Sequence, residues 1–112
     1  MNIPEEAYLL RIFIGESDKH GHIPLYEAIV TKAREAGLAG ATVLRGVMGF
    51  GRHSVMHTAK ILRLSEDLPM VVEIVDQPDK IESFVKVLNT MVPEGLVTLE
   101  PVRVIQYRSG NP

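Results

Sequence analysis

The order in which strand-like and helix-like segments follow one another constrains the fold of this chain more than any other feature. Apolar residues recur at helical spacing in two segments, about 24–36 and 78–91, which predicts two amphipathic helices. Strand-like segments occupy residues 7–14, 40–50, 70–76 and 96–107. The order strand, helix, strand, strand, helix, strand predicts an α+β fold of the ferredoxin-like βαββαβ type, a sandwich in which two helices cover one face of a four-stranded antiparallel sheet.

Prolines and glycines mark where these segments begin, end or bend. Pro24 and Pro78 suit the first turns of the two helices, and Gly37 is a natural C-terminal stop for the first. A glycine within a strand pattern, here Gly46, marks a bulge or a close approach of another part of the backbone. We also expect the last strand to bend or break at Pro101.

About 20 residues separate the second strand from the third, and residues 51–68 are expected to form a long excursion from the sheet. Within it, residues 60–64 (KILRL) have the composition of a short strand. Asp76 and Gln77, at the end of the third strand, are candidate caps for the second helix.

The length of 112 residues provides one hydrophobic core, so we expect a single domain over residues 1–112. The apolar runs are far too short to span a bilayer, and no export signal is visible, so no membrane insertion is expected. The absence of cysteine excludes disulfides and thiolate metal sites and is consistent with a cytoplasmic protein. A net charge of −2 gives no general reason to bind nucleic acid.

Apolar residues on the predicted strands outnumber the places that two helices can cover. Val72, Ile74, Val102 and Val104 suggest apolar side chains on both faces of the sheet. Because the helices bury only one face, we expect the other to be covered by self-association.

The sequence Gly49-Phe50-Gly51-Arg52 is a candidate anion site. Glycines permit backbone conformations in which amide N–H groups point at a phosphate, and arginine offers a planar fork of donors. The alternative is a strand end that needs flexible glycines, and on local sequence alone that alternative is favoured.

The four histidines form two close pairs that are weak candidate metal ligands. His53 and His57 are four residues apart and would face one way on a helix, and His20 and His22 would face one way in an extended segment. No third ligand accompanies His53 and His57, so chance placement in a long loop is the favoured interpretation of that pair. For the other pair, the favoured interpretation is that His22 caps the first helix.

Catalytic patterns are not found. No Gly-x-Ser-x-Gly sequence places a nucleophile at a turn, and the paired acids Glu5-Glu6 and Glu66-Asp67 are typical of a solvated surface. The sequence therefore predicts a binding or regulatory protein rather than an enzyme.

The motifs assembled so far resemble those of the PII-like superfamily of trimeric ferredoxin-fold proteins. Residues 37–52 read GLAGATVLRGVMGFGR, similar to the PII segment that runs from the first helix through the second strand to the base of the long T-loop. A C-terminal arginine, a small residue and a glycine follow at residues 108–110. The segments IGESDKHGHIPLYEAIV, ATVLRGVMGFG and DLPMVVEIVD are similar to a PII-related family catalogued as domain of unknown function 190, and the similarity extends over about residues 9–107.

The resemblance implies a homotrimer that binds a nucleotide in the cleft between neighbouring subunits. It assigns the ligand to a small set of positions, which are Gly40, Thr42, Gly49, Gly51, Arg52, His53 and Arg108. It also implies that residues 51–68 correspond to the T-loop, the segment through which PII proteins contact partners, so an unidentified protein or a membrane transporter is the expected partner.

Several departures from the PII pattern narrow the expected ligand. Gln106 stands where PII has an additional arginine, and residues 92–96 (VPEGL) contain no lysine, although the corresponding PII loop does. Fewer cations fit a less charged ligand than ATP, such as AMP or another adenine nucleotide. One extra residue near Gly46 fits the predicted bulge.

The T-loop equivalent departs from PII as well. It contains no tyrosine to receive a nucleotidyl group, so regulation by that modification is not expected. It still has a basic bias that suits an anionic ligand or an acidic partner surface, contributed by Arg45, Arg52, His53, His57, Lys60 and Arg63. Two alternatives to a nucleotide-sensing regulator remain open: a metal-responsive trimer that uses the histidines, and an enzyme that acts on a nucleotide.

Overall fold

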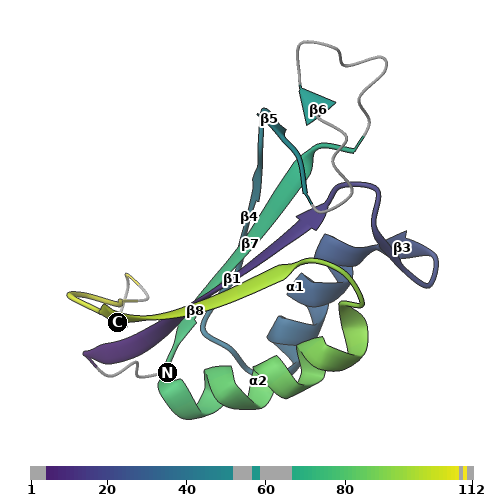
Figure 1. Ribbon diagram of the computed structural model, residues 1–112. Coiled ribbons are helices and arrows are strands. Elements are labelled where there is room, and N and C mark those ends of the chain that lie inside the picture. Colours follow the sequence, from purple (N-terminus) through teal and green to yellow (C-terminus); the bar gives the residue numbers. More distant parts are fainter. Residues whose placement is uncertain (1–4, 52–56, 59–66, 109, 111–112) are drawn as a thin grey trace.

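A computed structural model describes residues 5–51, 57–58, 67–108 and 110, and it confirms the predicted α+β sandwich. Two helices, α1 (Leu25–Glu35) and α2 (Pro78–Met91), cover one face of a four-stranded antiparallel sheet (Figure 1). The sheet has the order β4-β7-β1-β8. Its strands are β1 (Glu6–Gly15), β4 (Thr42–Arg45), β7 (Pro69–Asp76) and β8 (Leu96–Arg103).

The hydrophobic core lies between the helices and the central strands β1 and β7. Alternate residues of these strands face the helices, and Leu10, Ile12 and Ile74 are fully buried there. From the helices, Ile29 and Phe84 pack into the same core. The predicted helical spacing is confirmed, because the buried residues of each helix recur every three or four positions. Neither helix in the described ranges is long and apolar enough to cross a bilayer.

The helix ends differ in detail from the expectation. Gly37 ends α1 with φ of +78°, a conformation that glycine adopts readily, so that prediction is confirmed. Pro24 and Gln77 occupy the N-cap positions, and neither provides a side-chain cap. His22 is therefore not the cap of α1. Pro78 lies in the first turn of α2 as expected.

The second predicted strand is two separate strands. It divides at Gly46 into β4 and β5 (Met48–Gly49), and β5 pairs with β6 (His57–Thr58) in a small second sheet. Gly46 permits a close approach, because a Cβ atom there would lie 2.7 Å from the side chain of Pro69. Figure 1 shows β5 and β6 beyond the end of the main sheet. Residues 60–64, the predicted short strand, lie outside the described residues.

The last strand is shorter than predicted and unbroken at its proline. Pro101 lies within β8, opposite Tyr8 of β1, and the strand ends at Arg103 instead of Tyr107. β8 is an edge strand with a neighbour on one side only. Proline, which has no backbone N–H, is tolerated there because no second strand requires a donor at that position. Sequence analysis also missed a small hairpin of β2 (Lys19–His20) and β3 (Ile23–Pro24).

The face of the sheet away from the helices is apolar, but not for the reason first given. Val72 and Ile74 both point into the helix-covered core and are fully buried. The open face instead presents Phe13, Leu44 and Leu96, which are 36%, 49% and 57% exposed. Side chains alternate between the two faces along a strand, so Val72 and Ile74, which are two residues apart, must point to the same face.

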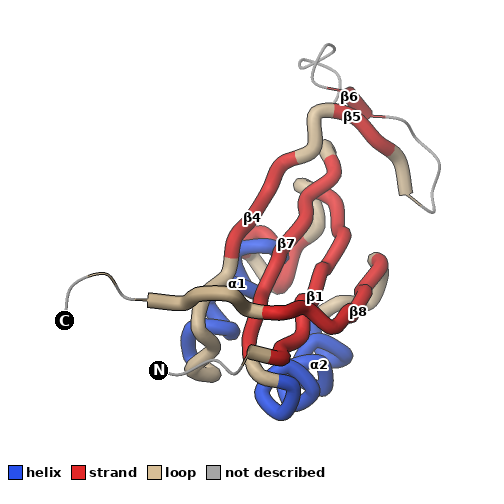
Figure 2. Tube along the Cα trace, turned by 90° about the vertical axis from the view of Figure 1, so that its left-hand side faces the viewer, coloured by secondary structure: helices blue, strands red, loops and turns tan. Residues whose placement is uncertain are grey.

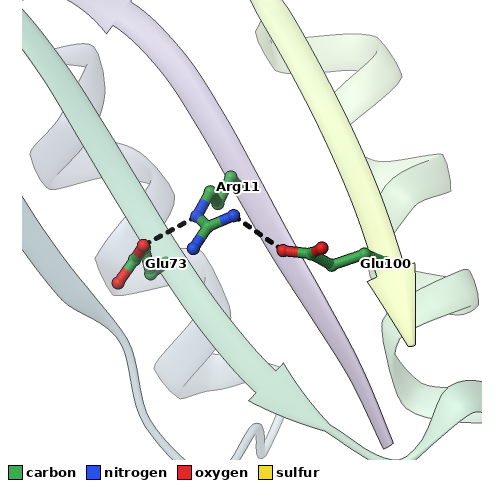
Figure 3. A network of polar contacts seen from close by, with 3 residues as sticks. All are labelled: Arg11, Glu73 and Glu100. Atoms are coloured by element: carbon green, nitrogen blue, oxygen red, sulfur yellow. Dashed lines mark hydrogen bonds and ion pairs between the residues drawn. The ribbon is translucent and has the colours of Figure 1, made fainter. Parts of the chain in front are cut away.

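A charged cluster lies in the middle of this open face. The Arg11 Nε donates to Glu73 Oε2 at 2.8 Å, and its Nη1 donates to Glu100 Oε1 at 2.7 Å, so one arginine of β1 joins β7 to β8 (Figure 3). The hydrogen bond from Arg11 to Glu73 raises the pKa of Arg11 above its ordinary value, and the arginine stays charged. The face therefore combines an apolar surface with one excess carboxylate.

Candidate functional site: the α1–β4 connection and the C-terminal segment

The connection between α1 and β4 is fixed by a buried aspartate at the end of β7. Asp76 is fully buried, and its Oδ2 accepts the backbone N–H of Ala39 at 2.9 Å. Its Oδ1 accepts the N–H of Gln77 at 2.7 Å, at the start of α2. Because both carboxylate oxygens are used, the burial of Asp76 is compensated, and the connection is attached to the first turn of α2.

The chain after β8 crosses the end of the sheet and reaches the same connection. The backbone N–H of Val104 donates to Glu5 O at 2.6 Å, and the Tyr107 hydroxyl donates to Ala39 O at 3.2 Å. Figure 2 shows this segment running from β8 past β1 and β7 on the side of the α1–β4 connection. Ala39 is thus hydrogen-bonded on both sides, through its N–H to Asp76 and through its carbonyl to Tyr107.

Three of the predicted ligand residues lie around this junction. Gly40 follows the hydrogen-bonded residue Ala39, Thr42 begins β4, and Arg108 follows Tyr107; all three are exposed. A Cβ atom placed on Gly40 would meet nothing within 4 Å, so space remains above its backbone. The arrangement offers a glycine backbone, a hydroxyl and a guanidinium to an anion.

A second cation lies at the same connection. Lys80, in the first turns of α2, donates from Nζ to Gly37 O at 3.4 Å. Sequence analysis did not select Lys80, Asp76 or Tyr107 for the site. Their helical or strand positions carried no motif, and only the folded chain places them beside residues 37–42.

The other predicted ligand residues lie elsewhere in the subunit or outside the described residues. Thr42 is opposite Glu73 of β7, whereas a Cβ atom on Gly49 would lie 3.1 Å from Pro69, four residues earlier in that strand. At a strand rise of about 3.3 Å per residue, the two places are about 13 Å apart. Gly51 is exposed beyond Gly49, and Arg52 and His53 are outside the described residues.

The described residues around the junction form an open surface. Two hollows of the isolated chain lie nearby, and neither is lined by Gly40, Thr42 or Arg108. One, of about 980 Å³, lies between the start of β1, Pro78 and β8. The other, of about 370 Å³, adjoins the C-terminal segment and is lined by Glu5 and residues 103–107.

One of the cations in the predicted basic bias is neutralised. The Arg45 Nη2 atom lies 3.0 Å from Glu16 Oε1, so this arginine belongs to an ion pair at the end of the sheet. Arg52, His53, Lys60 and Arg63 lie outside the described residues. Arg45 therefore adds no net positive charge to the predicted basic region.

The described histidines, His20, His22 and His57, do not have the backbone conformations predicted for a metal site. His20 pairs with Ile23 in the β2–β3 hairpin, and Gly21, with φ of +64°, makes the turn between His20 and His22, so the segment is not extended. His57 lies in a strand, and the helical alternative for it is wrong. Within the described ranges, no group of three His, Asp or Glu residues could hold a metal ion.

One protein family and several curated relatives match this chain over most of its length. A family model described as DUF190, uncharacterized ACR, matches residues 7–104. A protein of Aquifex aeolicus (strain VF5) named UPF0166 is 40% identical over 97 residues, which cover 87% of this chain and 91% of the relative. A UPF0166 protein of Methanocaldococcus jannaschii is 31% identical over 100 residues, covering 88% and 92%.

Solved structures with a similar fold are PII-like. The chain superimposes with a TM-score of 0.65 on CPII of Thiomonas intermedia K12 bound to ADP and bicarbonate, with 16% identity and 90% coverage of each chain. A second structure of CPII, described as a nitrogen regulatory PII-like protein bound to ADP, AMP and bicarbonate, gives a TM-score of 0.61 with 17% identity and the same coverage. These similarities confirm the PII-like ferredoxin fold.

Proposed function

The chain belongs to the DUF190 family, and we propose that it is a PII-like regulatory protein that binds a small anionic ligand, an adenine nucleotide, between the subunits of a homotrimer. The observation that carries this proposal is the junction at Ala39. There the Tyr107 hydroxyl bonds to Ala39 O, so the segment that ends at Arg108 meets the segment that contains Gly40 and Thr42, although the two are far apart in sequence. These are positions that the PII resemblance assigns to the ligand.

The need for a second subunit follows from the separation of the candidate residues. Thr42 and Gly49 are about 13 Å apart along β7 by strand rise, and the surface at Gly40 is open. A neighbouring copy that covers the open sheet face would supply its own glycine segment to the Arg108 side of the first. The apolar residues of that face, Phe13, Leu44 and Leu96, support such an assembly.

AMP fits the charges of the site better than ATP. Of the two CPII structures described above, one is bound to ADP and the other to ADP and AMP, which supports the adenine nucleotide class. Of the arginines that the PII resemblance assigns to the ligand, Arg108 is the one among the described residues, and Lys80 at the same connection already contacts Gly37 O. One guanidinium, with a lysine that already has a carbonyl partner, can neutralise a single phosphate better than three.

Regulation would act through residues 51–68, which correspond to the T-loop of PII proteins. Gly51, at the start of this segment, is one of the candidate ligand residues, so ligand binding would favour one arrangement of the segment over another. Such a switch requires different ligand affinities of the two arrangements. A protein or membrane transporter that recognises one arrangement is the proposed partner.

Isothermal titration calorimetry against AMP, ADP, ATP and cyclic AMP tests the proposal. We expect binding of AMP or ADP and weaker binding by Arg108→Ala, since a hydrogen bond to a charged group contributes about 1.5–3 kcal/mol, or about ten- to 150-fold in Kd. Lys86→Ala, which removes an exposed cation from the middle of α2, is the control and should bind as the wild type does. Absence of heat with all four nucleotides would exclude an adenine nucleotide as the ligand.

A further inference from the structure

Tyr107 occupies a position that sequence analysis passed over. Its side chain is 48% exposed, yet its hydroxyl reaches across to Ala39 O, 68 residues away in the chain. An exposed tyrosine on an irregular segment would be free to turn into solvent. The hydrogen bond instead attaches the C-terminal segment to the α1–β4 connection.

The C-terminal segment depends on few contacts. Its amides do not pair with a strand after Arg103. Within the described part of the chain, residues 104–108 have two hydrogen bonds to other segments, one from the Val104 N–H to Glu5 O and one from the Tyr107 hydroxyl. The first is at the end of β8, four residues before Arg108. Of these two hydrogen bonds, the one from Tyr107 lies nearer to Arg108 in the chain.

The other end of this bond is rigid. Ala39 is held through its own N–H by Asp76, which is fully buried and also accepts the first N–H before α2. A hydrogen bond to a fixed carbonyl restricts the donor more than a bond to a mobile one would. The Tyr107 hydroxyl is held at Ala39 O and Arg108 is the next residue in the chain, so the bond limits how far Arg108 can move away from the backbone of residues 39–40.

We infer that Tyr107 is a positioning residue: its hydrogen bond to Ala39 O holds the C-terminal segment so that Arg108 faces the Gly40–Thr42 segment before any ligand binds. The consequence for ligand affinity rests on the function proposed above. Tyr107 itself needs no contact with the ligand. Preorganisation of Arg108 would improve affinity, because the entropy of ordering a long cationic side chain is reduced before binding.

Tyr107→Phe tests this inference, because it removes the hydroxyl and leaves the ring. We expect AMP to bind about fivefold more weakly, the effect of a net hydrogen-bond contribution of about 1 kcal/mol. In the Arg108→Ala background, Tyr107→Phe should have no further effect on AMP affinity, since there is no guanidinium left to position. Tyr26→Phe, a loss of the hydroxyl from a half-buried tyrosine on α1, is the matched control.

The double mutant separates positioning from other roles. If Tyr107→Phe weakens AMP binding equally with and without Arg108, the tyrosine acts by direct contact or through the fold, and the inference is wrong. Unchanged AMP affinity in Tyr107→Phe, with Arg108→Ala still weakened, would also overturn it. Thermal unfolding of each variant shows whether stability has changed in parallel.

Hydrogen exchange of the ligand-free protein distinguishes this inference from the proposed function. We expect Tyr107→Phe, but not Tyr26→Phe, to speed amide exchange in residues 37–42 and 104–108, because the bond between the two segments is lost. If the wild type binds no nucleotide but Tyr107→Phe still exchanges faster than the wild type in these residues, the nucleotide function is wrong and the positioning role stands. Identical exchange in wild type and Tyr107→Phe would overturn the positioning role whether or not AMP binds.

Discussion

Asp76 shows how a single buried residue can join two parts of the molecule. Each of its oxygens accepts one backbone N–H, from Ala39 and from Gln77. We predict that Asp76→Ala lowers the free energy of unfolding by about 2–4 kcal/mol, because it leaves two N–H groups without their acceptor in a buried place. Urea unfolding measures this loss. Asp79→Ala, at an exposed position in the first turn of α2, should cost less than about 1 kcal/mol, the usual size of the interaction between an acidic side chain and a helix N-terminus; equal losses would contradict the assignment.

At Gly46, between β4 and β5, the chain leaves the main sheet. Its N–H donates to Pro69 O at 2.7 Å, and an added Cβ would lie 2.7 Å from Pro69 Cγ and 3.2 Å from that carbonyl oxygen. We predict that Gly46→Ala costs about 1–3 kcal/mol of stability, since backbone must shift to make room. Gly40→Ala is the control, because the space there is open. Thermal unfolding that leaves Gly46→Ala as stable as Gly40→Ala would refute this explanation.

Among the elements, α2 illustrates why helices were predicted more securely than strands. Its buried residues Ile81, Phe84, Leu88 and Met91 lie on one stripe, which the sequence displays without reference to any other element. We predict that Phe84→Ala lowers the free energy of unfolding by about 3–5 kcal/mol, because it opens a cavity in the core. Ser83→Ala, one residue earlier and exposed, should be near neutral in the same urea titration. A small effect of Phe84→Ala would mean that α2 does not pack as described.

For the whole molecule, the open sheet face predicts self-association. Phe13 lies on that face and is 36% exposed in the isolated chain. We predict that Phe13→Asp shifts the protein toward the monomer, because a charge would be buried between copies without a partner. Sedimentation velocity measures the shift. Ile23→Asp, at a 42% exposed residue of the β2–β3 hairpin, is the control and should leave assembly unchanged. A wild-type monomer at micromolar concentration would remove the basis of the trimer.

The charged cluster on the same face gives a second test of assembly. Arg11 neutralises part of the charge of Glu73 and Glu100, and all three would be taken out of water when copies meet. We predict that Arg11→Gln weakens association, because two unpaired carboxylates would be desolvated. The triple variant with glutamine at all three positions should associate more strongly than Arg11→Gln in sedimentation velocity. If Arg11→Gln assembles like wild type, the cluster lies outside the interface.

The sequence by itself determined the order of elements, both helices and the PII-like resemblance, because periodicity, prolines and glycines act within a few residues of chain. It could not decide which face of β7 meets the helices. Val71 to Val75 are mostly apolar on both sides, and only the packed sheet shows that Val72 and Ile74 are inside.

The candidate site was predictable only in part for the same reason. Gly40, Thr42 and Arg108 were named from a resemblance, and their meeting at Ala39 was decided by the path of the chain after Arg103. Asp76 and Tyr107, which hold that junction, carry no local signal, since a hydrogen bond between residues 37 or 68 positions apart depends on tertiary structure. Local patterning therefore specified the elements, whereas the contacts between distant segments specified the site.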